Sequence, residues 1–161
     1  MAGTTELAFR AVFRESEACG LQPVSQNPVH ESGRLRVYVL FTEMHETLVA
    51  LQSAVALSAG LPSEIALLVP VLVPYPLPLE EPPVSLGFLC RRITQLASAV
   101  AMEINAYVYL CRDPAMTIAE ALGRDSLIVI GRRKRWLFDR SPCIARKLRR
   151  LGHHVVLAES I

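Results

Sequence analysis

The sequence predicts an α/β fold, a doubly wound, five-stranded parallel sheet with helices on both faces. Between residues 34 and 161, apolar segments of strand length alternate with segments of helical periodicity, in the order β-α-β-α-β-α-β-α-β. The connections are short, and the strand segments are apolar at nearly every position, as in sheets that are covered on both faces. Right-handed crossovers between these units then give the doubly wound arrangement.

The first half of this domain begins at Arg34. Residues 35–41 form a β-branched and aromatic run that predicts a buried strand, and a helix is expected over residues 45–59, directly before Gly60. A second apolar strand is expected over residues 64–73. Six of the eleven prolines lie between positions 70 and 83, so this segment cannot be helical and indicates a stiff loop.

The second half repeats the alternation of helix and strand. Gly123 and Gly152 directly follow its last two helical segments, a position at which glycine often ends a helix. The expected segments, in order, are a helix over 84–102, a strand over 104–110, a helix over 114–122, a strand over 127–130, a helix over 141–151 and a strand over 155–158.

Residues 1–33 form an N-terminal extension outside this pattern. From Glu6 to Cys19, apolar residues recur on one helical face, which predicts a short amphipathic helix. The polar stretch over residues 22–33, with two prolines, then indicates a linker. Such a helix would dock on the domain, dock on a second subunit, or remain undocked.

Composition limits the class of protein. The chain is 52% hydrophobic, with a mean hydropathy of +0.33, but its longest apolar segment, residues 65–79, is too short to span a bilayer and contains four prolines. The N-terminus lacks the basic and apolar regions of a signal peptide. We therefore expect a cytoplasmic protein without membrane insertion, whose four cysteines are small apolar residues in or near the core and not metal ligands.

Positive charge is concentrated in the C-terminal third. Ten of the 17 lysines and arginines lie between Arg124 and Arg150, where Asp125 and Asp139 are the acidic residues. A basic region of this kind attracts anions, from nucleotides to acidic proteins, nucleic acids or lipids. We expect an anionic small ligand or an acidic protein partner, and no nucleic acid.

The fold predicts where a ligand would bind. In open α/β sheets, ligands lie at the carboxyl ends of strands where the winding direction reverses, which is between the first and fourth strands here. Thr42 follows the first strand. Gly131 follows the fourth, and the basic run Arg132–Arg135 comes directly after it.

The stretch from Asp113 to Arg133, DPAMTIAEALGRDSLIVIGRR, resembles the universal stress protein family of adenine-nucleotide-binding α/β proteins. The resemblance covers residues 34–159 in the order and length of the elements. It implies a non-enzymatic regulatory or stress-response protein with ATP or another adenine nucleotide as its only possible cofactor. It also implies a homodimer that pairs through the C-terminal edge strand from His154 to Glu159.

Nucleotide-binding members of that family carry Asp after the first strand, and Gly-x2-Gly-x9-Gly-Ser/Thr after the fourth. Gly131 matches the first glycine of this motif. Thr42, Lys134 and Ile144 stand in place of the Asp and of the other two glycines, and Ser141 is the nearest hydroxyl residue. A bulky side chain prevents the close approach of backbone and phosphate that glycine permits, so we expect weak or absent ATP binding.

Two interpretations of the basic run stay open. The side chains of Arg132, Arg133 and Lys134 could hold a phosphate, assisted by the helix that Ser141 begins. Alternatively, the run is a solvated loop, and Ser141 only caps its helix. The aromatic residues Trp136 and Phe138 in this segment either pack on the core or a partner, or stack on a base.

Catalytic patterns are absent from the sequence. We find no Walker A, G-x-S-x-G or H-E-x-x-H motif and no nucleophile–base pair. His45 and Glu46 open the first helix and are interpreted as a surface pair. An enzyme that acts on nucleotides remains as the alternative to a binding or regulatory protein.

Overall fold

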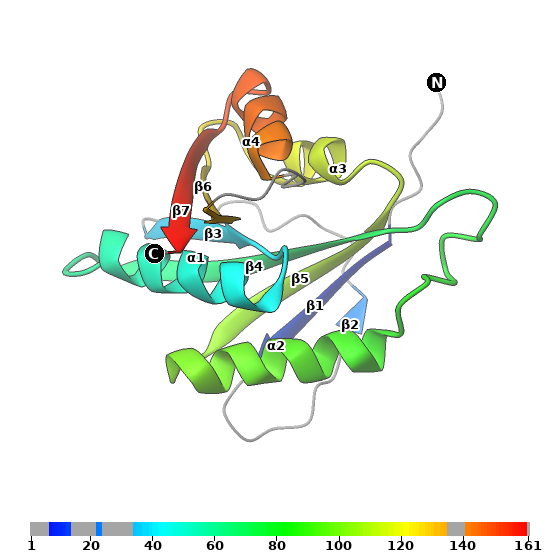
Figure 1. Ribbon diagram of the computed structural model, residues 1–161, viewed down its shortest axis with the longest axis horizontal. Coiled ribbons are helices and arrows are strands. Elements are labelled where there is room, and N and C mark those ends of the chain that lie inside the picture. The colour runs from blue at the N-terminus through cyan, green and yellow to red at the C-terminus, as the bar shows by residue number, and fades with distance from the viewer. Residues whose placement is uncertain (1–6, 14–21, 24–33, 135–140, 161) are drawn as a thin grey trace.

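The computed structural model describes residues 7–13, 22–23, 34–134 and 141–160, which form one seven-stranded sheet with four helices (Figure 1). The strand order is β2-β1-β5-β4-β3-β6-β7. The elements along the chain are β1 (Leu7–Phe13), β2 (Gln22–Pro23), β3 (Leu35–Leu40), α1 (Met44–Leu57), β4 (Ser63–Leu72), α2 (Leu86–Val100), β5 (Ile104–Cys111), α3 (Pro114–Ala121), β6 (Leu127–Arg133), α4 (Ser141–Arg150) and β7 (His154–Ser160).

The five strands predicted from the sequence form the parallel part of this sheet. From β3 the chain winds outward through β4 to β5, then returns to the other side of β3 to form β6 and β7. The winding therefore reverses between β3 and β6, where Leu40 and Ile130 are paired. This reversal confirms the predicted doubly wound parallel arrangement.

The helices cover both faces of the sheet, as predicted. Helices α1 and α2 lie on one face, and α3 and α4 lie on the other (Figure 1). Successive residues of β3 point to opposite faces, so Val37 and Val39 pack with α1 and α2 while Tyr38 and Leu40 pack with α3 and α4. Two apolar cores result, one on each face.

The N-terminal extension differs from its prediction. Residues 7–13 form β1, which pairs antiparallel with β5, so the expected amphipathic helix is wrong for these residues. Phe9, Ala11 and Phe13 alternate along the strand and pack into the α1–α2 core, with Phe13 only 1% exposed. Phe9 and Phe13 fit both periodicities because they are four positions apart, and pairing with the free edge of β5 favours the strand. Residues 14–21 lie outside the described part of the chain.

The extension therefore enlarges the predicted five-stranded sheet to seven strands. The second added strand is β2, two residues long, which pairs with β1 where a linker was expected. At the opposite end of the sheet, β7 is the edge strand, next to β6. No helix in the described part of the chain is long and apolar enough to cross a membrane.

Candidate functional site

The predicted ligand site lies where β3 and β6 end side by side. Beyond the paired residues Leu40 and Ile130, the chain continues to Thr42 on one strand and to Gly131 on the other. The structure brings both of these predicted site residues against Glu46 in the first turn of α1, a residue that was not predicted to belong to the site.

Glu46 is buried, with 8% of its surface exposed. The hydroxyl of Thr42 donates a hydrogen bond to Glu46 Oε2 at 3.2 Å, and the backbone N–H of Thr42 donates to the hydroxyl of Thr47 at 3.1 Å. The interpretation of His45 and Glu46 as a surface pair is thus wrong for Glu46, although His45 is exposed. The position of Glu46 in the first helical turn did not show on which side of the helix its side chain lies.

Gly131 is in close contact with the backbone of α1. A Cβ atom at this position would lie 1.9 Å from the carbonyl oxygen of Glu46 and 2.4 Å from its carbonyl carbon. Both distances are far inside van der Waals contact, so any side chain here would displace the first turn of α1. Helix packing by itself therefore requires glycine at this position, whether or not a phosphate binds.

Strand β6 continues beyond Gly131. Gly131, Arg132 and Arg133 pair in parallel register with Ala158, Glu159 and Ser160 of β7. The predicted end of this strand at Ile130 is therefore wrong, because three further residues belong to the sheet. Phosphate-binding loops of the nest type need turn conformations that direct successive N–H groups to one point, and an extended strand does not provide them.

The basic side chains at this edge differ in their surroundings. Arg132 forms an ion pair with Glu159 of β7, with Nη1 at 3.5 Å from Oε1, and both side chains are half-exposed. Arg133 and Lys134 are exposed, and Lys134 follows the last residue of β6. Arg135 and the two aromatic residues after it lie outside the described residues.

Ser141 is the first residue of α4, at the position predicted from the sequence. It is only 3% exposed, so it belongs to the buried side of this helix together with Ala145 and Leu148. The outer side of α4 carries Arg146, Lys147 and other basic residues. Burial of Ser141 agrees with a structural role at the helix start and makes it a poor surface ligand.

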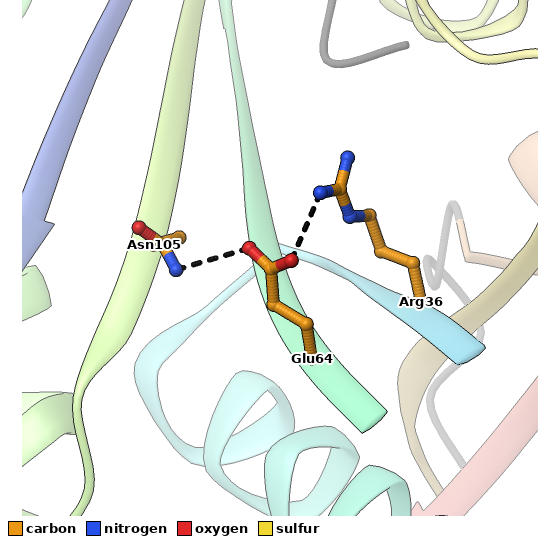
Figure 2. A network of polar contacts seen from close by, with 3 residues as sticks. All are labelled: Arg36, Glu64 and Asn105. Carbon is orange, nitrogen blue, oxygen red and sulfur yellow. Dashed lines mark hydrogen bonds and ion pairs between the residues drawn. The ribbon is translucent and has the colours of Figure 1, made fainter. Parts of the chain in front are cut away.

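The structure also shows a polar network that the sequence analysis missed (Figure 2). It joins Arg36 of β3, Glu64 of β4 and Asn105 of β5 near the amino ends of these strands. Arg36 Nη2 lies 2.9 Å from Glu64 Oε2, and Asn105 Nδ2 donates to Glu64 Oε1 at 3.2 Å. Both carboxylate oxygens are therefore engaged, and the network ties three adjacent strands together.

Electrostatics agree with a structural role for this network. Burial alone would lower the pKa of Arg36, but hydrogen bonds to Glu64 and Tyr38 raise it above its ordinary value. Burial raises the pKa of Tyr38. The signal in the sequence was the pair Arg36 and Glu64, two charged residues one position inside apolar strands, which the structure places in direct register.

Arg112 stabilises the proline-dense loop at the carboxyl ends of β4 and β5. Its Nη1 donates to the carbonyl of Val73 at 2.6 Å, and its Nη2 donates to that of Leu77 at 2.8 Å. The guanidinium also stacks on the ring of Tyr75, 4.1 Å from the centroid. The guanidinium of Arg112 thus binds the loop, although this residue lies at the edge of the sheet where ligands bind in this fold.

The described residues contain no group of three or more His, Cys, Asp or Glu side chains that could hold a metal ion. No protein-family model matches the chain, and neither does any curated protein or solved structure. The resemblance to universal stress proteins accordingly rests on the sequence pattern alone.

Proposed function

We propose that the chain is a non-enzymatic, universal-stress-protein-like regulatory protein that binds ATP weakly or not at all. The observation that carries this proposal is the contact of Gly131 with Glu46, next to a strand β6 that continues to Arg133. A glycine that resembles the start of a phosphate-binding loop is here used for helix packing. We place the protein in the cytoplasm on the basis of its sequence.

Two physical effects support weak binding of ATP. Each backbone hydrogen bond to a charged phosphate that cannot form costs about 1.5–3 kcal/mol, so two such losses reduce affinity at least about a hundredfold. In addition, the carboxyl group of Glu46 lies beside Thr42, where it opposes a nearby phosphate when ionised. Both effects act at the end of β3 and β6, where a nucleotide would bind in this fold.

Titration calorimetry with ATP and magnesium tests this proposal. We expect a dissociation constant of about 100 μM or more, because a site with a dissociation constant of about 1 μM would be weakened at least about a hundredfold by the two losses. Submicromolar affinity would contradict the proposal. Magnesium-dependent ATP hydrolysis that is lost in a Thr42→Val variant would instead favour the enzymatic alternative.

The second candidate function is anion binding by Arg132, Arg133 and Lys134. It is favoured by the exposure of Arg133 and Lys134 at the carboxyl edge of the sheet. Guanidinium and ammonium groups bind phosphate without any glycine loop. The expected partner is a phosphorylated small molecule or an acidic protein.

A charge-matched pair of variants tests this second candidate. Arg133→Ala with Lys134→Ala should weaken binding of inorganic pyrophosphate and reduce its salt dependence. Arg91→Ala with Arg92→Ala removes the same charge from α2, which is a different element from β6, and should have little effect. Equal loss in both variants would show that only net charge matters.

The proposal includes a homodimer through β7. This strand is at the edge of the sheet, and its side facing away from β6 has no strand partner among the described residues. The N-terminal strand β1 lies beyond β5, at the opposite end of the sheet, so it does not cover β7. Pairing of two β7 strands about a two-fold axis would be antiparallel and self-complementary.

A further inference from the structure

The end of α4 contains a buried histidine in an unusual place. Gly152 has a φ of +93°, and its N–H donates to the carbonyl of Arg149 at 3.1 Å, while the N–H of His153 donates to that of Leu148 at 3.2 Å. These two bonds define the glycine-containing motif that ends many helices. The residue after the glycine in this motif is commonly apolar and packs back on the helix; here it is His153.

The imidazole of His153 is almost completely enclosed. Only 5% of the residue is exposed, and its Nδ1 has no hydrogen-bond partner among the described residues. The ring also makes a hydrogen bond to the backbone of Ala119 in α3. The ring of His153 therefore connects the end of α4 to α3.

The surrounding contacts join four elements at one corner of the molecule. In the turn before β6, the N–H of Asp125 donates to the carbonyl of Gly152 at 3.2 Å, and the carbonyl of Ser126 accepts from the N–H of His154 at 2.9 Å. Arg149 Nη2 donates to the carbonyl of Val155 in β7 at 2.8 Å. The position of β7 thus depends on the segment that contains His153.

The charged groups around the ring provide little support for a protonated imidazole. Burial lowers the pKa of His153; the hydrogen bond to Ala119 and the charge of Asp125 act in the opposite direction, and His154 adds to the lowering. Asp125 itself is largely exposed and lies 3.9 Å from the ring of His154. From α4, the carbonyl of Leu148 accepts a hydrogen bond from the backbone N–H of His153, and from α3 the backbone of Ala119 makes one with the ring.

We propose that His153 is a pH-sensitive switch, whose protonation releases the corner formed by α3, α4 and β7 before the rest of the sheet unfolds. A second proton on the ring would place an N–H donor in a buried position without an acceptor among the described residues, together with an uncompensated charge. When this corner is released, the edge strand β7 is free to rearrange. This inference does not depend on ATP binding or on dimer formation.

The direction and size of the effect follow from proton linkage. In the open form, His153 has the ordinary histidine pKa of about 6.5, so that form gains protons as the pH falls through this value. If the closed form stays unprotonated, opening at pH 5.5 is favoured up to about tenfold over opening at neutral pH. Amides of α4 and β7 should lose protection by this factor.

Hydrogen exchange, expressed as protection factors at pH 7.5 and pH 5.5, tests the switch on the whole chain. In the wild type, we expect the amides of α4 and β7 to lose up to about tenfold in protection, with β4 and β5 unchanged. His153→Leu, which places an apolar residue in the helix-end motif, should abolish this loss. His154→Leu removes the adjacent exposed histidine and should retain it.

Three results would overturn the proposal. The first is an acid-dependent loss of amide protection that persists in His153→Leu. The second is a loss of protection that disappears in His154→Leu instead. The third is a loss of protection that is spread equally over all strands. Should His153→Leu not fold, His153→Gln supplies a neutral polar side chain for the same comparison. An NMR titration of the wild type adds a direct test, because a His153 ring that protonates at its ordinary pKa without local opening also contradicts the switch.

Discussion

Gly131 and Glu46 are in backbone contact across the end of the sheet, with the carbonyl oxygen of Glu46 at 1.9 Å from the place of a Cβ on Gly131. This contact fixes the start of α1 against the end of β6. The buried carboxyl group of Glu46 lies beside Thr42 at the end of β3. The glycine that most resembles a nucleotide-binding motif therefore has a sufficient structural explanation.

Replacing Gly131 with Ala should destabilise the protein. The added methyl group meets backbone atoms of Glu46, which can move only if α1 moves, and overpacking of this kind costs about 1–3 kcal/mol or more. Gly87→Ala is the matched control, because Gly87 lies in α2 with no atom within 4 Å of its Cβ position. There, in the first turn of α2, the change should alter the free energy of unfolding by less than about 0.5 kcal/mol. Urea unfolding measures both, and equal effects would contradict the packing argument.

The hydroxyl of Thr42 is expected to stabilise buried Glu46. Thr42→Val removes the 3.2 Å hydrogen bond to Glu46 Oε2 and should reduce the free energy of unfolding by about 1–3 kcal/mol. Thr94→Val provides the comparison, since the hydroxyl of Thr94 donates to the carbonyl of Cys90 within α2. Its effect should stay below about 0.5 kcal/mol. An insensitive Thr42 would show that Glu46 does not need this donor.

The Arg36–Glu64 pair should couple more strongly than the Arg132–Glu159 pair. The first has a 2.9 Å contact and side chains exposed by 21% and 29%, whereas the second has a 3.5 Å contact and side chains exposed by 40% and 49%. Double-mutant cycles to Ala should give about 1–2 kcal/mol for the first pair and less than about 0.5 kcal/mol for the second. Equal couplings would mean that the network in Figure 2 adds nothing beyond a surface ion pair.

The parallel sheet could be predicted because its strands are apolar on both faces and three of its four helical segments are followed by glycine. The N-terminal strand could not, because Phe9 and Phe13, four positions apart, fit a helical face as well as an alternating strand, and pairing with β5 decides between them. Similarly, basic residues such as Arg132 and Arg133 are typical of loops, yet their pairing with β7 makes them part of strand β6.

The position of the candidate site could be predicted from the sequence, but not all of the residues that form it. The fold rule located Thr42 and Gly131 at adjacent strand ends, and the structure places them there. Glu46 was missed because one charged residue in the first helical turn does not show its orientation, which depends on how α1 packs on β6. Arg36 and Glu64 were missed because strand register is a tertiary property.

Lys147 should make stability depend on acid pH through Asp113. The hydrogen bond from Lys147, at 2.7 Å, holds the pKa of Asp113 below its ordinary value. This contribution is therefore present above the ordinary Asp pKa of about 3.9 and is lost as the pH falls below it. Because both side chains are nearly half-exposed, it should not exceed about 1 kcal/mol. Lys147→Met should lose less stability than the wild type between pH 6 and pH 3, and an identical loss would contradict the assignment.

A lysine on the edge strand should prevent the proposed dimer. Leu157 is a partly buried residue of β7, and a Lys in its place would bring like charges together when two β7 strands pair about a two-fold axis. Light scattering at micromolar concentration should give a dimer for the wild type and a folded monomer for Leu157→Lys. Leu61→Lys, at an exposed position before β4, makes the same chemical change away from the edge and should remain dimeric. A monomeric wild type, or a Leu157→Lys variant that stays dimeric, would exclude pairing through β7.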